Sequence, residues 1–156
     1  MALAYDSKNN VAGSGLITIP MVFPATGQVL VVTVVNAVSG GARAGGAPYI
    51  NTTANPLTQV GSMVSGAAEC DTEMWYFLDV STYFVGNYSV YVPNTGSDAL
   101  NVIASIYKGA VAAALDQSTS TNTTAANPSL TLNNVPDGSV VVDVLGSGYK
   151  DAPTGN

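Results

Sequence analysis

The stretch that most limits how this chain can fold is Gln28–Val38, QVLVVTVVNAV, where β-branched and apolar residues follow one another almost without interruption. Successive side chains of a strand point to opposite faces of its sheet, so this stretch needs apolar cover on both faces. It therefore predicts a central strand inside a layered β-fold. Ala99–Gly109 predicts a half-buried strand, with four apolar side chains on one face: Leu100, Val102, Ala104 and Ile106.

The other apolar runs are short and are separated by turn residues, at spacings of about 8–14 residues. Leu16–Phe23 contains Pro20, which cannot donate a ladder hydrogen bond and therefore predicts an edge strand or a bend. Two shorter candidate strands lie near Tyr49–Thr53 and Gln59–Val64.

Two further strand pairs are predicted in the second half of the chain. Glu73–Pro93, which holds the single tryptophan, predicts a hairpin with Gly86 in its turn. Ser129–Val135 and Ser139–Leu145 predict two more strands, joined by the turn sequence PDG. In total we expect an all-β protein of eight or nine short strands, folded as an antiparallel β-sandwich or a jelly-roll-like variant.

Few residues of this chain carry charge: 9% of them, against roughly 25% in an ordinary domain. Charged faces for several amphipathic helices are therefore lacking, and hydration must come from Ser, Thr, Asn and Gly. Such a composition is typical of β-rich proteins that assemble into something larger.

The charge balance argues against two classes of partner. The chain has four basic and ten acidic residues. The basic residues are scattered along the chain: Lys8, Arg43, Lys108 and Lys150. Nucleic acid and anionic membrane surfaces both attract clustered cations, so we expect neither as a partner. The sequence also shows no signal-peptide pattern and no apolar run of membrane-spanning length, so we expect synthesis in a cytoplasm.

The residue types that most enzymes use are scarce. The chain has no histidine, which removes the commonest general base and the imidazole ligands of zinc and copper sites. Cys70 is the single cysteine, so no intrachain disulfide can form. Neither a nucleophile elbow nor a phosphate-binding glycine pattern occurs. We therefore expect no enzyme, no catalytic residues, no cofactor and no metal.

Three carboxylates alternate along one segment: Glu69, Asp71 and Glu73. Residues two apart in a strand share a face, so a cation site or an acid–base pair would be possible there. Because like charges repel and no calcium-loop sequence accompanies them, we favour a solvated strand edge. The preceding SGGARAGGAP is interpreted as a flexible connection.

The aromatic residues that follow raise three possibilities. Both faces of the strand around Trp75 and Tyr76 are apolar, which favours a plug in the sandwich core. An aromatic subunit interface and a sugar-stacking platform stay open as alternatives. The candidate residues for an interface with a partner protein or a second subunit are Leu3, Tyr5, Tyr76, Tyr83, Phe84 and Tyr91.

The order of these motifs resembles that of β-sandwich domains in tailed-bacteriophage virion proteins. Trp75 to Leu78 match a tryptophan strand, and Gly86–Val92 (GNYSVYV) match a strand of the GTYTVTV type. Val102–Gly109 and Gly138–Val144 match two later strands, so that the likeness covers roughly residues 28–150. In the resembled domains a further strand pair follows. Either a neighbouring subunit supplies that pair here or the sequence is a fragment, and an open last sheet would favour pairing with another chain.

This resemblance implies a non-enzymatic virion protein, above all a capsid decoration protein on the outer surface of a phage head. Its partners would be the major capsid protein and itself, as a small homo-oligomer such as a trimer. The alternative is a carbohydrate-binding β-sandwich module of a tail fibre or surface protein. We expect a flexible N-terminal arm over residues 1–15 that could order on the shell. A single sandwich domain over residues 16–150 and a C-terminal tail over residues 151–156 would follow.

Overall fold

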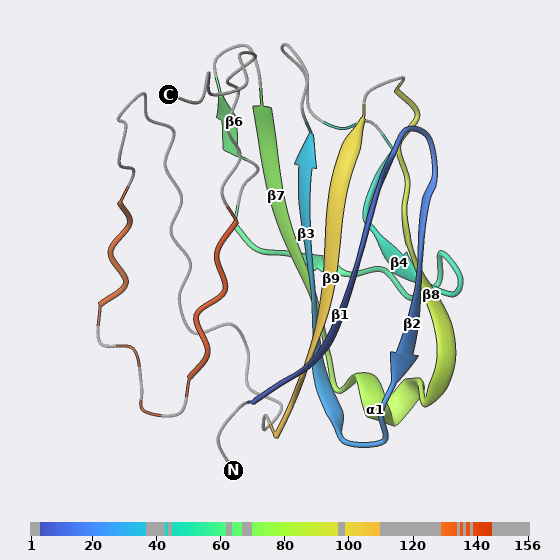
Figure 1. Cartoon of the computed structure of the whole chain (residues 1–156), viewed down its shortest axis with the longest axis vertical. Coiled ribbons are helices and arrows are strands. Elements are labelled where there is room, and N and C mark those ends of the chain that lie inside the picture. Colours follow the sequence, from blue (N-terminus) through green and yellow to red (C-terminus); the bar gives the residue numbers. More distant parts are fainter. Residues whose placement is uncertain are drawn as a thin grey trace, which may run out of the picture.

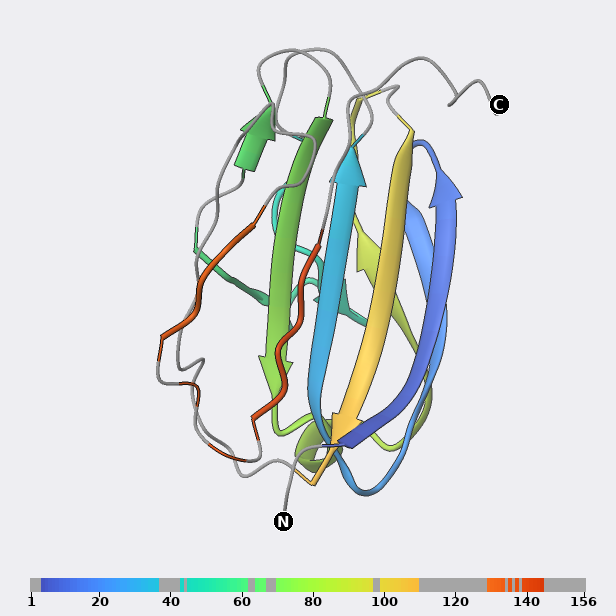
Figure 2. The same cartoon turned by 60° about the vertical axis from the view of Figure 1, so that its left-hand side comes forward.

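The computed structural model describes residues 4–36, 43, 45–61, 64–66, 70–96, 99–109, 129–133, 135, 137 and 139–144. Two antiparallel sheets pack face to face (Figures 1 and 2), which confirms the predicted all-β sandwich. The larger sheet has six strands, of which five follow in the order β1 (Ala4–Gly13), β9 (Leu100–Lys108), β3 (Gly27–Asn36), β7 (Cys70–Leu78) and β5 (Thr58–Gln59). The sixth, β6 (Val64–Gly66), also pairs with β7. A jelly-roll connectivity stays a prediction.

The smaller sheet has three strands, in the order β2 (Ile17–Phe23), β8 (Gly86–Val92) and β4 (Tyr49–Ile50). β2 lies at the edge of this sheet, as Pro20 predicted. Its burial alternates strictly, because Ile17, Ile19, Met21 and Phe23 point into the core while the residues between them are exposed.

Strand β3 is central, as its sequence predicted. It pairs with β9 on one side and β7 on the other along nearly its whole length. On its inner side Leu30, Val32 and Val34 are fully buried, and on its outer side Val31 and Thr33 each keep only 8% exposure. Both faces of β3 are therefore covered.

The core lies between the sheets and is built from rows of opposed side chains. The cross-strand register places Trp75, Val32 and Ala104 in one row of the inner face. All four predicted apolar positions of β9 are buried, so its predicted half-buried character is confirmed. Trp75 belongs to the same core cluster, as expected of a sandwich plug.

The predicted hairpin over Glu73–Pro93 is wrong. β7 belongs to the six-stranded sheet and β8 to the three-stranded sheet, and the short helix α1 (Val80–Tyr83) connects them. Asp79 starts this crossing in a left-handed conformation, with φ of 51°. Val80 and Phe84 explain the difference, because both are buried in the core and a surface hairpin loop would leave them in water.

The expectation of a flexible arm over residues 1–15 is wrong for residues 4–13. These residues form β1, which pairs with β9 from Ala4 to Gly13 with one irregularity between Tyr5 and Ser7. An edge strand can be this polar, because only one of its faces is turned to the core. Val11 supplies the apolar contact with that core.

The two strands predicted near the C-terminal end are not found in the described residues, which are 129–133, 135, 137 and 139–144. These residues are extended and lie outside the sandwich, on the outer side of the six-stranded sheet (Figures 1 and 2). The neighbouring edge of β7 is already paired with β5 and β6, so no free edge is left there for them. The turn at PDG includes residues outside the described set.

Replacing Phe23 by alanine should lower the free energy of unfolding by about 3–5 kcal/mol, since its ring is buried and a cavity would remain. Its neighbour Val22 is 65% exposed, so Val22→Ala should change stability by no more than about 0.5 kcal/mol. Urea unfolding of both variants measures the difference. Equal losses would contradict the alternation of β2.

Candidate functional site

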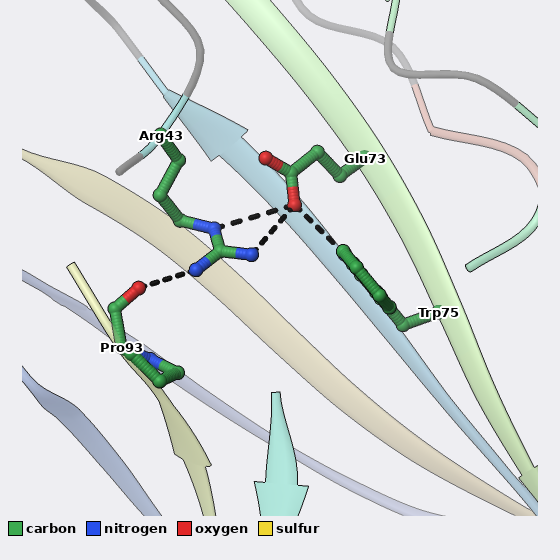
Figure 3. Close-up of polar contacts among 4 residues, drawn as sticks. All are labelled: Arg43, Glu73, Trp75 and Pro93. Atoms are coloured by element: carbon green, nitrogen blue, oxygen red, sulfur yellow. Dashed lines mark hydrogen bonds and ion pairs between the residues drawn. The ribbon is translucent and has the colours of Figure 1, made fainter. Parts of the chain in front are cut away.

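The most concentrated polar chemistry in the described structure is a buried cluster of Arg43, Glu73 and Trp75 (Figure 3). One carboxylate oxygen, Oε2 of Glu73, accepts hydrogen bonds from Arg43 Nη2 at 2.9 Å, Arg43 Nε at 3.3 Å and Trp75 Nε1 at 2.8 Å. Arg43 Nη1 also donates to the carbonyl oxygen of Pro93. The guanidinium carbon lies 5.9 Å from the Trp75 ring centroid, within cation–π range.

The local backbone explains why these groups meet. Glu73 and Trp75 are two residues apart on β7 and so share its inner face. Arg43 comes from the glycine-rich connection, where Gly45 has φ of +138°. A Cβ built on Gly45 would lie 2.7 Å from both the carbonyl carbon and oxygen of Pro93, so only glycine allows this approach.

Two consequences concern the predicted acidic segment. The solvated strand edge is wrong for Asp71 and Glu73, because both are buried; Glu69 lies outside the described residues. Asp71 stands opposite Asn36, also buried, so one end of the core is polar. A guanidinium supplies the counter-charge that burial of Glu73 requires.

Chemically, the cluster is suited to holding the sheets together rather than to catalysis. The Oε2 atom of Glu73 already has three donors, and Arg43 ties β7 in one sheet to Pro93, which follows β8 in the other. No three His, Cys, Asp or Glu side chains gather closely enough to hold a metal ion in the described part of the chain. Nor does any described helix have the length and apolar character that crossing a bilayer requires.

The predicted interface residues do not form one patch. Phe84 is buried among Phe23, Phe77 and Tyr88, so its assignment to an interface is wrong. Leu3 lies outside the described residues. The other four are spread over three surfaces: Tyr5 and Tyr76 on the outer face of the large sheet, Tyr83 on α1 and Tyr91 on the small sheet.

The outer face of the large sheet carries an exposed aromatic pair. Tyr5 of β1 and Tyr107 of β9 are direct cross-strand partners, with ring centroids 6.1 Å apart and planes at 76°. The same register row continues through Val29 to Leu78. Tyr5 is 52% exposed. Burial raises the pKa of the Tyr107 hydroxyl above its ordinary 10.0, and the nearby Tyr5 raises it further.

A second surface feature lies on the outer face of the small sheet. The rings of Tyr49 and Tyr91 are stacked, with centroids 5.1 Å apart and planes at 19°. Beside Tyr91 is an open hollow of about 360 Å³ without a charged residue in its lining. The hollow is lined by Pro20, Met21, Val22, Asn51, Asn87, Tyr88, Ser89 and Tyr91.

No protein-family model, curated protein or solved structure matches this chain. The interpretation of its surfaces therefore depends on the geometry of its own residues.

Sequence reasoning missed Arg43 as a functional residue. The available signal was chemical rather than periodic: a lone cation inside an uncharged, glycine-rich segment of a chain with only four basic residues. Such a cation needs a partner once the segment packs against the core. The sequence did not say which acid that partner would be.

Removing one member of the buried pair should cost more than removing both. Glu73→Gln and Arg43→Met should each lower the free energy of unfolding by about 3–5 kcal/mol, because each leaves a polar partner buried without its counterpart. The double variant should therefore lose less than either single variant, because neither charge is then left buried alone. Chemical denaturation of the four proteins measures this coupling.

The matched control is the exposed ion pair of Lys108 and Asp6, whose charged atoms are 3.0 Å apart. Lys108→Met should cost only about 0–1 kcal/mol. A Glu73→Gln loss as small as that of the control would mean that the buried cluster does not hold the sandwich together.

Proposed function

We propose that this protein is a non-enzymatic structural component of a tailed-phage virion, namely a decoration protein that binds the major capsid protein on the outer surface of the head. The observation that carries the proposal is the outer face of the six-stranded sheet. That face presents the Tyr5–Tyr107 pair and the half-exposed Ile103 on a broad, firmly paired sheet.

Several properties of this face suit a protein partner. Tyrosine is enriched in interfaces because its ring buries apolar area while its hydroxyl tolerates water. The few charges of the chain reduce the desolvation penalty of a large contact. The segments 129–133 and 139–144 lie on the same side of the large sheet (Figures 1 and 2), and they contain the exposed residues Leu130 and Val141.

In the proposed mechanism, the stabilisation of the capsid grows with the surface area that each copy buries and with the number of copies bound. A decoration protein makes no chemical change; it links neighbouring capsid subunits, and its own small oligomer engages several of them at once. Linked contacts raise the effective affinity by orders of magnitude without any new interaction. The resemblance of the motif order to phage β-sandwich domains supports the choice of a capsid as the partner.

Co-sedimentation with empty heads of the virus that encodes the protein tests this proposal. We expect saturable binding at a fixed ratio to the major capsid protein. Tyr5→Ser should weaken binding at least about tenfold, as loss of an aromatic anchor does. Tyr83→Ser, at a similarly exposed ring on α1, should leave it unchanged. Protein that stays in the supernatant at every concentration would refute the proposal.

A second candidate function, carbohydrate binding, is favoured by the hollow beside Tyr91. Its lining combines the ring of Tyr91 with the amides of Asn51 and Asn87 and the hydroxyl of Ser89. Ring faces pack on the C–H faces of sugars, while amides and hydroxyls bond to sugar hydroxyls. Trp75, by contrast, is buried and cannot serve as a platform.

A screen of neutral oligosaccharides tests this second candidate. Binding should weaken at least about tenfold in Tyr91→Ala and persist in Tyr83→Ala, whose ring lies on a different surface. If no neutral oligosaccharide binds, or if Tyr91→Ala binds as the unchanged protein does, the hollow is not a sugar site.

A further inference from the structure

Residues 139–144, SVVVDV, have the sequence of a strand but belong to none in the described structure. Val140, Val142 and Val144 share one side of this extended segment, while Ser139, Val141 and Asp143 share the other. Val141 is 60% exposed and Val140 is 36% exposed. A run of β-branched residues without a ladder, with two of its valines exposed, is suited to adding to an open sheet edge.

Strand β1 offers such an edge. In the part of the chain that the structure describes, β1 pairs with β9 alone, so one edge of this ten-residue strand is unpaired. The opposite edge of the same sheet is formed by β5 and β6 along β7, which are only two and three residues long and offer little backbone to a further strand. The edge of β2 in the smaller sheet carries Pro20, which cannot donate to a ladder, and the Pro20 carbonyl accepts a hydrogen bond from Asn9.

Charges on the two segments are complementary. Among the described basic side chains, Arg43 pairs with Glu73 and Lys108 pairs with Asp6. Lys8, exposed in the middle of β1, has no carboxylate within ion-pair distance among the described residues. Asp143 is the exposed acid within the valine segment.

We propose that residues 139–144 of one copy add to β1 of a second copy as an antiparallel strand, with Asp143 opposite Lys8. This register places Val140 opposite Val11 and Val142 opposite Asn9, on the side of β1 that is turned to the core. Val141 then stands opposite Asn10 on the outer side. One register thus forms an ion pair, extends the core at Val11 and pairs the open backbone edge.

The position of the segment favours a second copy over the chain's own β1. Residues 139–144 lie on the outer side of the large sheet near β7 and β3 (Figure 2), whereas β1 is at the opposite edge, beyond β9. Twenty-nine residues separate Gly109 from Ser139. Released from the sheet together with residues 129–133, such a length can span up to about 100 Å, far more than the radius of gyration of roughly 15 Å for a domain of this size, so a neighbouring copy is within reach.

The inference deepens the proposed function, on which it rests for its biological setting, by naming how the copies of the oligomer are joined. Mutual exchange between two copies would give a two-fold dimer, and exchange in one direction would close a ring such as a trimer. Either way, each copy both donates and receives one strand.

Engineered disulfides test the register directly. Asn10→Cys and Val141→Cys, combined with Cys70→Ser so that only the new thiols react, should form links between chains on mild oxidation. Non-reducing electrophoresis should then show covalent multiples of the chain. The control pairs Asn10→Cys with Thr131→Cys, outside the proposed strand, and should remain monomeric on the gel. A link within one chain, or no link in the test pair, would overturn the proposal.

A charge exchange provides a second, independent measurement. Lys8→Glu and Asp143→Lys should each weaken self-association at least about tenfold by light scattering, and the double variant should restore it. Urea midpoints of the four proteins show whether each is folded. Self-association that is indifferent to both single changes would contradict the Lys8–Asp143 pairing.

Capsid co-sedimentation of the same proteins separates this inference from the proposed function. Protein that forms the interchain disulfide but does not sediment with capsids would support the strand exchange and contradict the decoration role. Protein that sediments with capsids but forms no interchain disulfide would support the decoration role and contradict the strand exchange.

Discussion

The constraint on which the rest of the structure depends is that β3 is apolar on both sides. A strand of this kind cannot lie in a sheet with one wet face, since half of its side chains would then be left in water. Its inner side is covered by the smaller sheet, and its outer residues Val31 and Thr33 are also buried. The packing of the smaller sheet onto the large one follows, while residues 129–133 and 139–144 lie on the outer side of the large sheet (Figure 2).

Elements whose residues alternate could be predicted from the sequence, because alternation reports burial directly. The buried face of β9, the central place of β3 and the edge position of β2 with its Pro20 are of this kind. Connections were harder to predict. Whether β7 and β8 pair with each other or cross between sheets depends on where Val80 and Phe84 are buried, and no local pattern encodes that.

The candidate sites show the same division. Alternation along Glu69, Asp71 and Glu73 predicts a shared face but does not say whether that face is wet, since this depends on a cation thirty residues away in the chain. The sequence predicts that the exposed tyrosines contribute to an interface. It does not predict that they lie on three different surfaces, because that depends on the sheet topology. Residues 139–144 illustrate a further limit. A strand-forming sequence becomes a strand only where an unpaired edge receives it.

The hydrogen bonds of Arg43 have a mechanical consequence for the sandwich. Apolar attraction between layers is not directional, so it resists slip only through the fit of interdigitated side chains. A guanidinium fixed at once to Glu73 of one sheet and to Pro93 beside the other allows no such slip (Figure 3). At this end the two sheets therefore resist shear along the strand direction. The opposite end is filled by Phe23, Phe77 and Phe84, whose rings hold it through the fit of their packing.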